Sequence, residues 1–98
     1  MVQLRIEWDD AKDAANRRKH GVPFGEAATV FYDERALLIA DPEHSADEDR
    51  FLLLGLSMRL RILVVCHCYR ESEEVIRIFS ARKADVSERK FYNRRPKS

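Results

Sequence analysis

Alternating polar and apolar side chains at the beginning of the chain predict a strand. In residues 3–8, Leu4, Ile6 and Trp8 would share one face, and polar side chains would occupy the other. A strand with one apolar face is buried on one side only. The chain therefore starts with an element that needs a helix or another layer to cover it.

Two helical segments follow this strand. Asp9 or Asp10 is a suitable N-cap for a helix that runs to about His20, and Gly21 follows as its C-terminal cap. In residues 24–31 the apolar side chains recur at helical spacing, which predicts a second helix facing the core.

The remaining pattern predicts four strands and a last helix. The strands are expected at residues 36–40, 50–57, 61–69 and 73–80, with a polar acidic loop at 41–49, and the helix at 85–94. The expected order is β-α-α-β-β-β-β-α in a single domain of residues 1–98. The predicted fold class is α+β, an antiparallel meander sheet with the helices packed on one face.

The acidic and basic residues are unevenly distributed, although the net charge is only +1. Residues 1–58 contain 7 Lys/Arg and 12 Asp/Glu, a net charge of −5, and residues 59–98 contain 11 and 5, a net charge of +6. A basic half is suited to a polyanion, although an ordinary solvated surface would look the same.

Several classes of protein are disfavoured by the sequence. The apolar runs are too short for a membrane-spanning helix, and the first ten residues lack the apolar core of a signal peptide, so we expect a cytoplasmic protein. Cys66 and Cys68 flank His67 in a predicted strand, where two small buried side chains are expected rather than a metal site. We expect no metal and no cofactor.

Four segments carry a family resemblance that spans most of the chain. They are EWDDAKDAANRRKHGVPFGEAATVF (7–31), DPEHSADEDRFLLLGLS (41–57), LVVCHCYR (63–70) and IRIFSARKADVSERKFY (76–92). In this order they resemble the BrnT toxins. The resemblance implies a RelE-like fold, ribonuclease activity, and a BrnA-type antitoxin partner in a type II toxin–antitoxin pair. It also implies a hetero-oligomer with that antitoxin, which would carry the DNA-binding part.

RNA cleavage without a metal requires three catalytic roles. A base removes the proton of the 2′-hydroxyl, cations stabilise the pentacovalent phosphorane, and an acid protonates the leaving 5′-oxygen. Arginine suits the stabilisation of the phosphorane because its planar guanidinium matches two phosphate oxygens.

The last strand and helix supply the first candidates. By similarity to RelE-like nucleases, Arg82 and Tyr92 are the predicted catalytic residues, with Lys83 as a further catalytic candidate and Arg77 and Arg89 as RNA-binding residues. The alternative is that these are solvated charges, and that the Tyr92 ring packs on the sheet.

The first helix and the beginning of the strand at 50–57 supply the others. Lys12, Lys19 and His20 fall on one stripe with Asn16, and we expect catalytic roles for Lys12 and His20 and RNA binding by Lys19. His20 has a structural alternative, stabilisation by the helix dipole. Arg50, at the end of the acidic loop, is an expected RNA-binding residue, and His67 is expected to be a core residue.

Two functions compete on this sequence. The first is a metal-independent ribonuclease toxin that cleaves RNA and inhibits translation and growth. The second is a non-catalytic module that binds RNA, the ribosome or the antitoxin. A degenerate, inactive toxin is a third reading, which the intact motifs disfavour.

Overall fold

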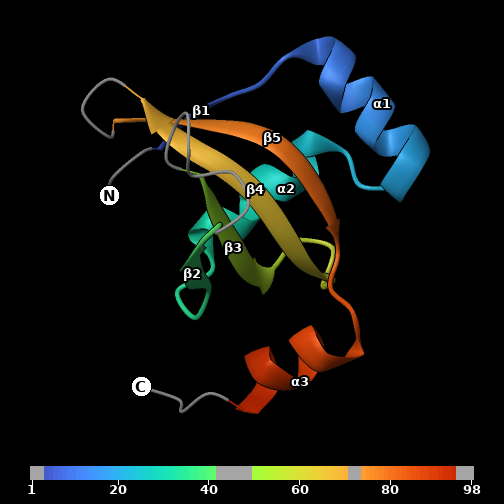
Figure 1. Cartoon of the computed structure of the whole chain (residues 1–98), viewed down its shortest axis with the longest axis vertical. Coiled ribbons are helices and arrows are strands. Elements are labelled where there is room, and N and C mark those ends of the chain that lie inside the picture. The colour runs from blue at the N-terminus through green and yellow to red at the C-terminus, as the bar shows by residue number, and fades with distance from the viewer. Residues whose placement is uncertain (1–3, 42–49, 71–73, 95–98) are drawn as a thin grey trace.

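The computed structural model describes residues 4–41, 50–70 and 74–94. Within these ranges the chain forms five strands, three α-helices and one short 3-10 helix, η1 (Figure 1). In order they are β1 (Arg5–Glu7), α1 (Asp10–His20), α2 (Phe24–Thr29), η1 (Val30–Tyr32), β2 (Leu37–Ala40), β3 (Phe51–Leu56), β4 (Ile62–Arg70), β5 (Val75–Lys83) and α3 (Val86–Arg94). This confirms the predicted order of elements. The predicted acidic loop, apart from Asp41, and the predicted strand residues Gln3 and Glu73 lie outside the described residues.

The strands form one mixed sheet in the order β1-β5-β4-β3-β2. Each of the strands β2 to β5 pairs antiparallel with the next along the chain. Strand β1, however, lies parallel to β5, with Ile6 beside Ile76, so the prediction of a purely antiparallel sheet is wrong. The alternation of side chains sets which face of β1 is buried. It carries no information on the strand that β1 joins.

The helices cover both faces of the sheet, which corrects the prediction that they pack on one face. Leu53 and Leu54 are neighbours on β3 and belong to different clusters of buried side chains. Leu53 packs with Phe24 and Ala27 of α2, whereas Leu54 packs with Tyr92 of α3. In Figure 1, α2 crosses behind the strands and α3 lies at the bottom of the view. No helix in the described ranges is long and apolar enough to cross a membrane.

Helix α1 begins and ends where the sequence predicts. The Asp9 carboxylate accepts hydrogen bonds from the backbone N–H groups of Ala11 and Lys12, at 2.8 and 3.1 Å. Gly21 ends the helix with a φ of 72°, a left-handed conformation that glycine adopts without steric strain.

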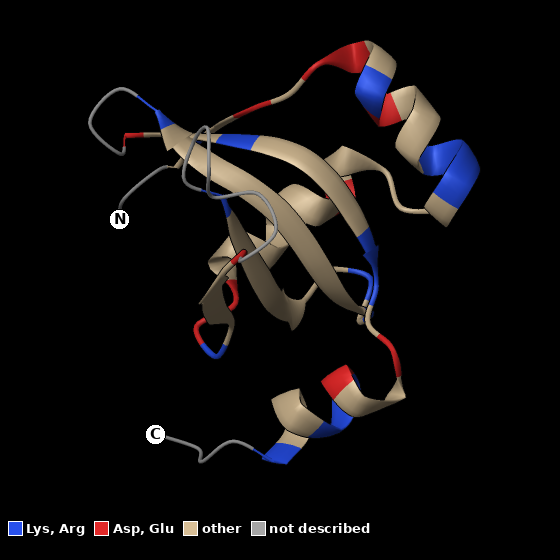
Figure 2. Cartoon of the chain, in the orientation of Figure 1, with Lys and Arg blue, Asp and Glu red and all other residues tan. Residues whose placement is uncertain are grey.

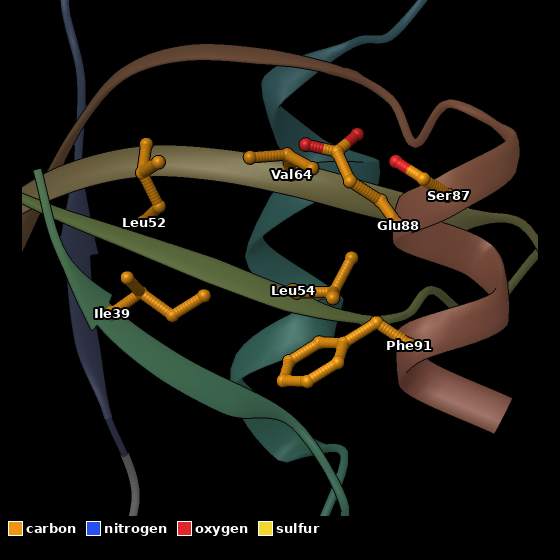
Figure 3. A pocket seen from close by; sticks show the side chains of 7 residues that line it. All are labelled: Ile39, Leu52, Leu54, Val64, Ser87, Glu88 and Phe91. Carbon is orange, nitrogen blue, oxygen red and sulfur yellow. The ribbon is translucent and has the colours of Figure 1, made fainter. Parts of the chain in front are cut away.

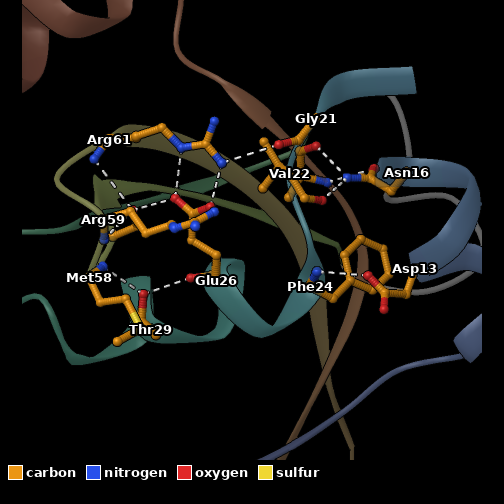
Figure 4. A network of polar contacts seen from close by, with 12 residues as sticks. Asp13, Asn16, Gly21, Val22, Phe24, Glu26, Thr29, Met58, Arg59 and Arg61 are labelled. Carbon is orange, nitrogen blue, oxygen red and sulfur yellow. Dashed lines mark hydrogen bonds and ion pairs between the residues drawn. The ribbon is translucent and has the colours of Figure 1, made fainter. Parts of the chain in front are cut away.

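A buried amide fixes α1 against β5. The Asn16 side-chain amide donates to the carbonyl groups of Val22 and Ala81, at 2.9 and 2.8 Å, and its oxygen accepts from the Ala81 N–H at 3.1 Å. Asp13 caps α2 in the same region by accepting from the Phe24 N–H (Figure 4). Strand β1 pairs with β5 only as far as Arg77, so Asn16 takes the place of a neighbouring strand at Ala81.

An ion pair joins α2 to the turn between β3 and β4 (Figure 4). The Glu26 carboxylate is buried, and it accepts from the Arg61 guanidinium and from the Ser57 hydroxyl, the latter at 2.6 Å. Hydrogen bonding by Arg61 is the main reason that the pKa of Glu26 is lowered, and the Ser57 hydroxyl adds to it. The guanidinium also donates to the Gly21 carbonyl at 3.2 Å, so one side chain ties three segments together.

We expect Asn16→Ala to destabilise the protein by about 2–4 kcal/mol, because two carbonyls and one N–H lose buried partners. Urea denaturation followed by circular dichroism measures the free energy of unfolding. Arg17→Ala, an exposed change on the same helix, is the control and should alter it by less than about 0.5 kcal/mol. Equal stabilities of the two variants would contradict the role given to Asn16.

The Glu26–Arg61 pair predicts a pH dependence of stability. The pKa of Glu26 is lower in the folded than in the unfolded state, so its contribution to stability is complete above the ordinary glutamate pKa of 4.5 and disappears as the pH falls through the folded value. At pH 7, Glu26→Gln should therefore lower the free energy of unfolding by about 1–3 kcal/mol. Urea titrations at a series of pH values should show this difference shrinking in acid. Exposed Glu34→Gln is the matched control, and a difference independent of pH would refute the prediction.

Candidate functional site

Two arginines of β5 project from the face of the sheet on which α3 packs. Arg82 stands opposite Val64 of β4, which belongs to the α3 cluster. Arg77 stands opposite Cys68, which points to the same side as Val64 because every second residue of a strand shares a face. The Arg77 guanidinium pairs with Glu7 of β1, with 2.8 Å between Nη1 and Oε2. Basic segments accordingly lie near both ends of β5 in Figure 2.

A β-bulge brings two further cations to this part of the sheet. The pairing of β4 with β5 shifts register between Cys66 and His67, which leaves Phe79 as the extra residue of β5. The Arg50 guanidinium carbon lies 4.1 Å from the centre of the Phe79 ring, and Lys12 Nζ lies 5.3 Å from it. Both distances are suitable for cation–π attraction. Two segments distant in sequence thus place positive charge around one half-buried ring of β5.

Arg82 is held in a fixed orientation by the first turn of α3. Its Nη1 and Nη2 donate to Oε1 and Oε2 of Glu88, at 2.8 and 2.9 Å. Glu88 also accepts from the Asp85 N–H, while Asp85 accepts from the Glu88 N–H, each at 2.8 Å, which is a capping box. Hydrogen bonding between the two side chains raises the pKa of Arg82 and lowers that of Glu88. Both side chains are part exposed, 42% and 27%, so a ligand can reach the guanidinium.

The side chain of Tyr92 lies between α3 and the sheet. It is 7% exposed, and its hydroxyl donates to Asp33 Oδ2 at 2.6 Å. The same oxygen accepts from the Leu56 N–H at 2.8 Å. Next to Leu56, a Cβ atom at Gly55 would lie 2.8–3.0 Å from side chains that include Asp33, so this close approach requires glycine. This placement fits the packing alternative better than contact with a substrate.

The end of α1 lies apart from Lys12. Lys19 is exposed and His20 half-buried in the last turn of the helix. Eight residues of helix separate Lys12 from His20, a rise of about 12 Å. The structure therefore does not bring these two predicted catalytic residues together.

Lys83 and Arg89 both follow Arg82 in sequence, and their side chains take other directions. Lys83 stands opposite Leu63, which packs in the α2 cluster, so its side chain leaves the other face of the sheet. Arg89 is exposed on α3, and its Nη1 donates to the Ala84 carbonyl at 2.8 Å. The Lys83 carbonyl accepts from Arg82 Nη1 at 3.3 Å, so the backbone of Lys83, and not its ammonium group, contacts the Arg82 guanidinium.

His67 and the two cysteines are core residues, as predicted. His67 is fully buried, with its ring nitrogens 3.1 Å from the Val65 carbonyl and 3.2 Å from the Tyr69 hydroxyl. Burial lowers the pKa of His67 and raises that of Cys66. Cys66 and Cys68 are not joined by a disulfide. Among residues 4–41, 50–70 and 74–94, no group of three or more His, Cys, Asp or Glu side chains is placed to hold a metal ion.

Sequence reasoning missed three side chains that shape this site. Glu88 had a usable signal, because Asp85 followed three residues later by glutamate is a capping-box pattern. Phe79 had none, since a bulge depends on the pairing of two strands. Asp33 had none either, because its partner Tyr92 lies 59 positions further along the chain.

Comparison with known proteins supports one family. Residues 8–88 match the family described as "Ribonuclease toxin, BrnT, of type II toxin-antitoxin system". The structure is similar to the 1.1 Å crystal structure of the Brucella abortus ribonuclease toxin BrnT, with a TM-score of 0.61 and 25% sequence identity. That match covers 85% of this chain and 99% of the Brucella chain. No curated protein matches the sequence.

The matched region includes Arg77, Arg82 and Glu88, together with Lys12, Arg50 and Phe79. It therefore spans both groups of side chains described above. The chain belongs to the BrnT family of ribonuclease toxins of type II toxin–antitoxin systems.

Proposed function

We propose that this protein is a single-domain, metal-independent endoribonuclease that acts in the cytoplasm. By cleaving RNA it inhibits translation and growth, and a BrnA-type antitoxin neutralises it in a hetero-oligomer. We further propose that its fold is RelE-like.

The observation that supports the proposal most is the arrangement of Arg82. Its guanidinium is oriented by two hydrogen bonds and stays partly exposed. Because Nη1 and Nη2 each donate one N–H to Glu88, we assign the phosphate to the other edge of the guanidinium, where Nε–H and the second N–H of Nη2 match two phosphate oxygens. Little reorganisation is needed when the phosphate binds there. Glu88 is thus a positioning residue for the candidate catalytic arginine.

The other cations are assigned to the RNA backbone. Arg77 shares the Arg82 face of the sheet. Lys12 and Arg50 meet at Phe79, which lies between these two arginines along β5. Together they form a basic track along β5, to which we assign the binding of successive phosphates. Lys19 and Arg89 extend the basic surface at the ends of α1 and along α3.

Proton transfer requires groups near the phosphate held by Arg82. His20, Lys12 and Lys83 remain the proposed candidates for the acid and the base. His67 is buried among aromatic rings, and the Tyr92 hydroxyl is already bonded to Asp33. These two placements are what most favours the second candidate function, a module that binds RNA, the ribosome or the antitoxin without cleaving RNA.

We expect Arg82→Lys to slow RNA cleavage by roughly 100- to 1000-fold, because lysine keeps the charge but loses the bidentate fork. End-labelled RNA on a sequencing gel, in buffer containing EDTA, measures the rate. Arg18→Lys, an exposed arginine of α1, is the matched control and should cleave like the wild type. Activity that disappears in EDTA would refute metal independence. Salt-dependent RNA binding with no cleavage products would favour the binding module.

Tyr92→Phe separates a catalytic from a structural tyrosine. Because the hydroxyl is bonded to Asp33 under α3, its loss should reduce the free energy of unfolding by about 1–2 kcal/mol. Cleavage per folded molecule should stay within about threefold of the wild-type rate. Thermal denaturation and the gel assay measure the two effects. A drop in rate of 100-fold or more in a folded variant would show that Tyr92 acts on the substrate.

A further inference from the structure

An apolar groove lies between the sheet and α3, beside the Arg82–Glu88 pair (Figure 3). Its volume is about 240 Å³, and its walls are Ile39, Leu52, Leu54, Val64, Ser87, Glu88 and Phe91. In Figure 3 the ring of Phe91 extends from α3 toward the strands, below Leu54, and faces Ile39. Five of the seven side chains are apolar, so the groove offers little to a phosphate group.

The apolar walls of this groove are exposed to an unusual degree. Phe91 is 57% exposed and Ile39 is 43% exposed. Apolar side chains that gather in an exposed groove mark a surface for another macromolecule. Aromatic side chains in such a groove supply the largest share of binding energy in protein interfaces.

Charge around the groove indicates what kind of segment it accepts. Lys90 and Arg94 are exposed on α3, and helical spacing places Lys90 next to Ser87 and Arg94 next to Phe91, two residues that line the groove. At the other end, the Glu88 carboxylate is already engaged by Arg82. The unneutralised charges that flank the apolar floor on α3 are therefore positive. A partner segment with apolar side chains bordered by carboxylates is complementary to this surface, whereas a second copy of α3 would be repelled.

We propose that this groove is the docking site for an acidic, amphipathic segment of the antitoxin. The inference rests on the proposed function, since a type II toxin implies an antitoxin protein. The segment inserts apolar side chains between Phe91 and Ile39 and sets its carboxylates against Lys90 and Arg94.

Occupation of the groove also explains neutralisation. Glu88 forms one wall of the groove and holds the guanidinium of Arg82 through both carboxylate oxygens. A segment bound there lies against the arginine that receives the RNA phosphate. RNA and antitoxin then compete for adjoining surfaces, and α3 is fixed in place.

The test compares two exposed apolar residues of the same helix. Phe91→Ala removes a wall of the groove, and Val86→Ala is the control, because Val86 is 58% exposed and does not line the groove. The probe is the purified BrnA-type antitoxin of the proposed pair, titrated calorimetrically against the whole chain. Phe91→Ala should weaken binding roughly 10- to 100-fold and still cleave RNA like the wild type. Val86→Ala should match the wild type in both assays.

The other possible results also decide whether the groove is the docking site of the antitoxin. Wild-type affinity of Phe91→Ala for the antitoxin would overturn the docking site, whether or not the toxin cleaves RNA. Loss of RNA cleavage by a folded Phe91→Ala variant would overturn it as well, because the groove would then belong to the RNA. If Phe91→Ala lowers the melting temperature, Ile39→Ser tests the opposite wall from β2. If no variant, including the wild type, cleaves RNA, the ribonuclease proposal fails while the titration still decides the docking site.

Discussion

The ion pair between Arg82 and Glu88 joins the end of β5 to the first turn of α3. Helix α3 packs on the face of the sheet opposite α2, where the cluster of buried side chains is small and a groove remains. The pair, the capping box of Asp85 and the Tyr92–Asp33 hydrogen bond hold the helix there. If the pair were absent, the guanidinium would lose its fixed orientation and the groove would lose a wall. The phosphate site and the proposed antitoxin site therefore share one constraint.

The sequence predicted those parts of the fold that depend on neighbouring residues. Asp9 and Gly21 cap α1 as expected, because capping is set within a few residues. The meander from β2 to β5 follows from short connections between alternating segments. The parallel pairing of β1 with β5 joins residues about 70 positions apart, and strand alternation cannot specify such a partner. The position of α3 on the second face is a tertiary effect of the same kind.

The candidate site shows the same division. Alternation along β5 puts Arg77 on the face opposite Ile76 and Ile78, but the bulge at Phe79 shifts every later residue by one position. That shift puts Arg82 on the same face as Arg77. The family pattern suggested a role for Tyr92, and the structure places its hydroxyl on Asp33, a contact that no local pattern reveals. The sequence therefore indicates which residues are candidates more readily than it indicates which residues they contact.

The central claim is that the Arg82 guanidinium receives the scissile phosphate. It is tested most directly by NMR of the arginine side-chain N–H groups during titration with a 2′-O-methylated RNA, which binds but cannot be cleaved because its nucleophile is blocked. If the guanidinium receives the phosphate, the Nε–H signal of Arg82 shifts as RNA is added, and salt reverses the shift. An Arg82 signal that stays unchanged while other arginine signals move would show that the phosphate binds elsewhere.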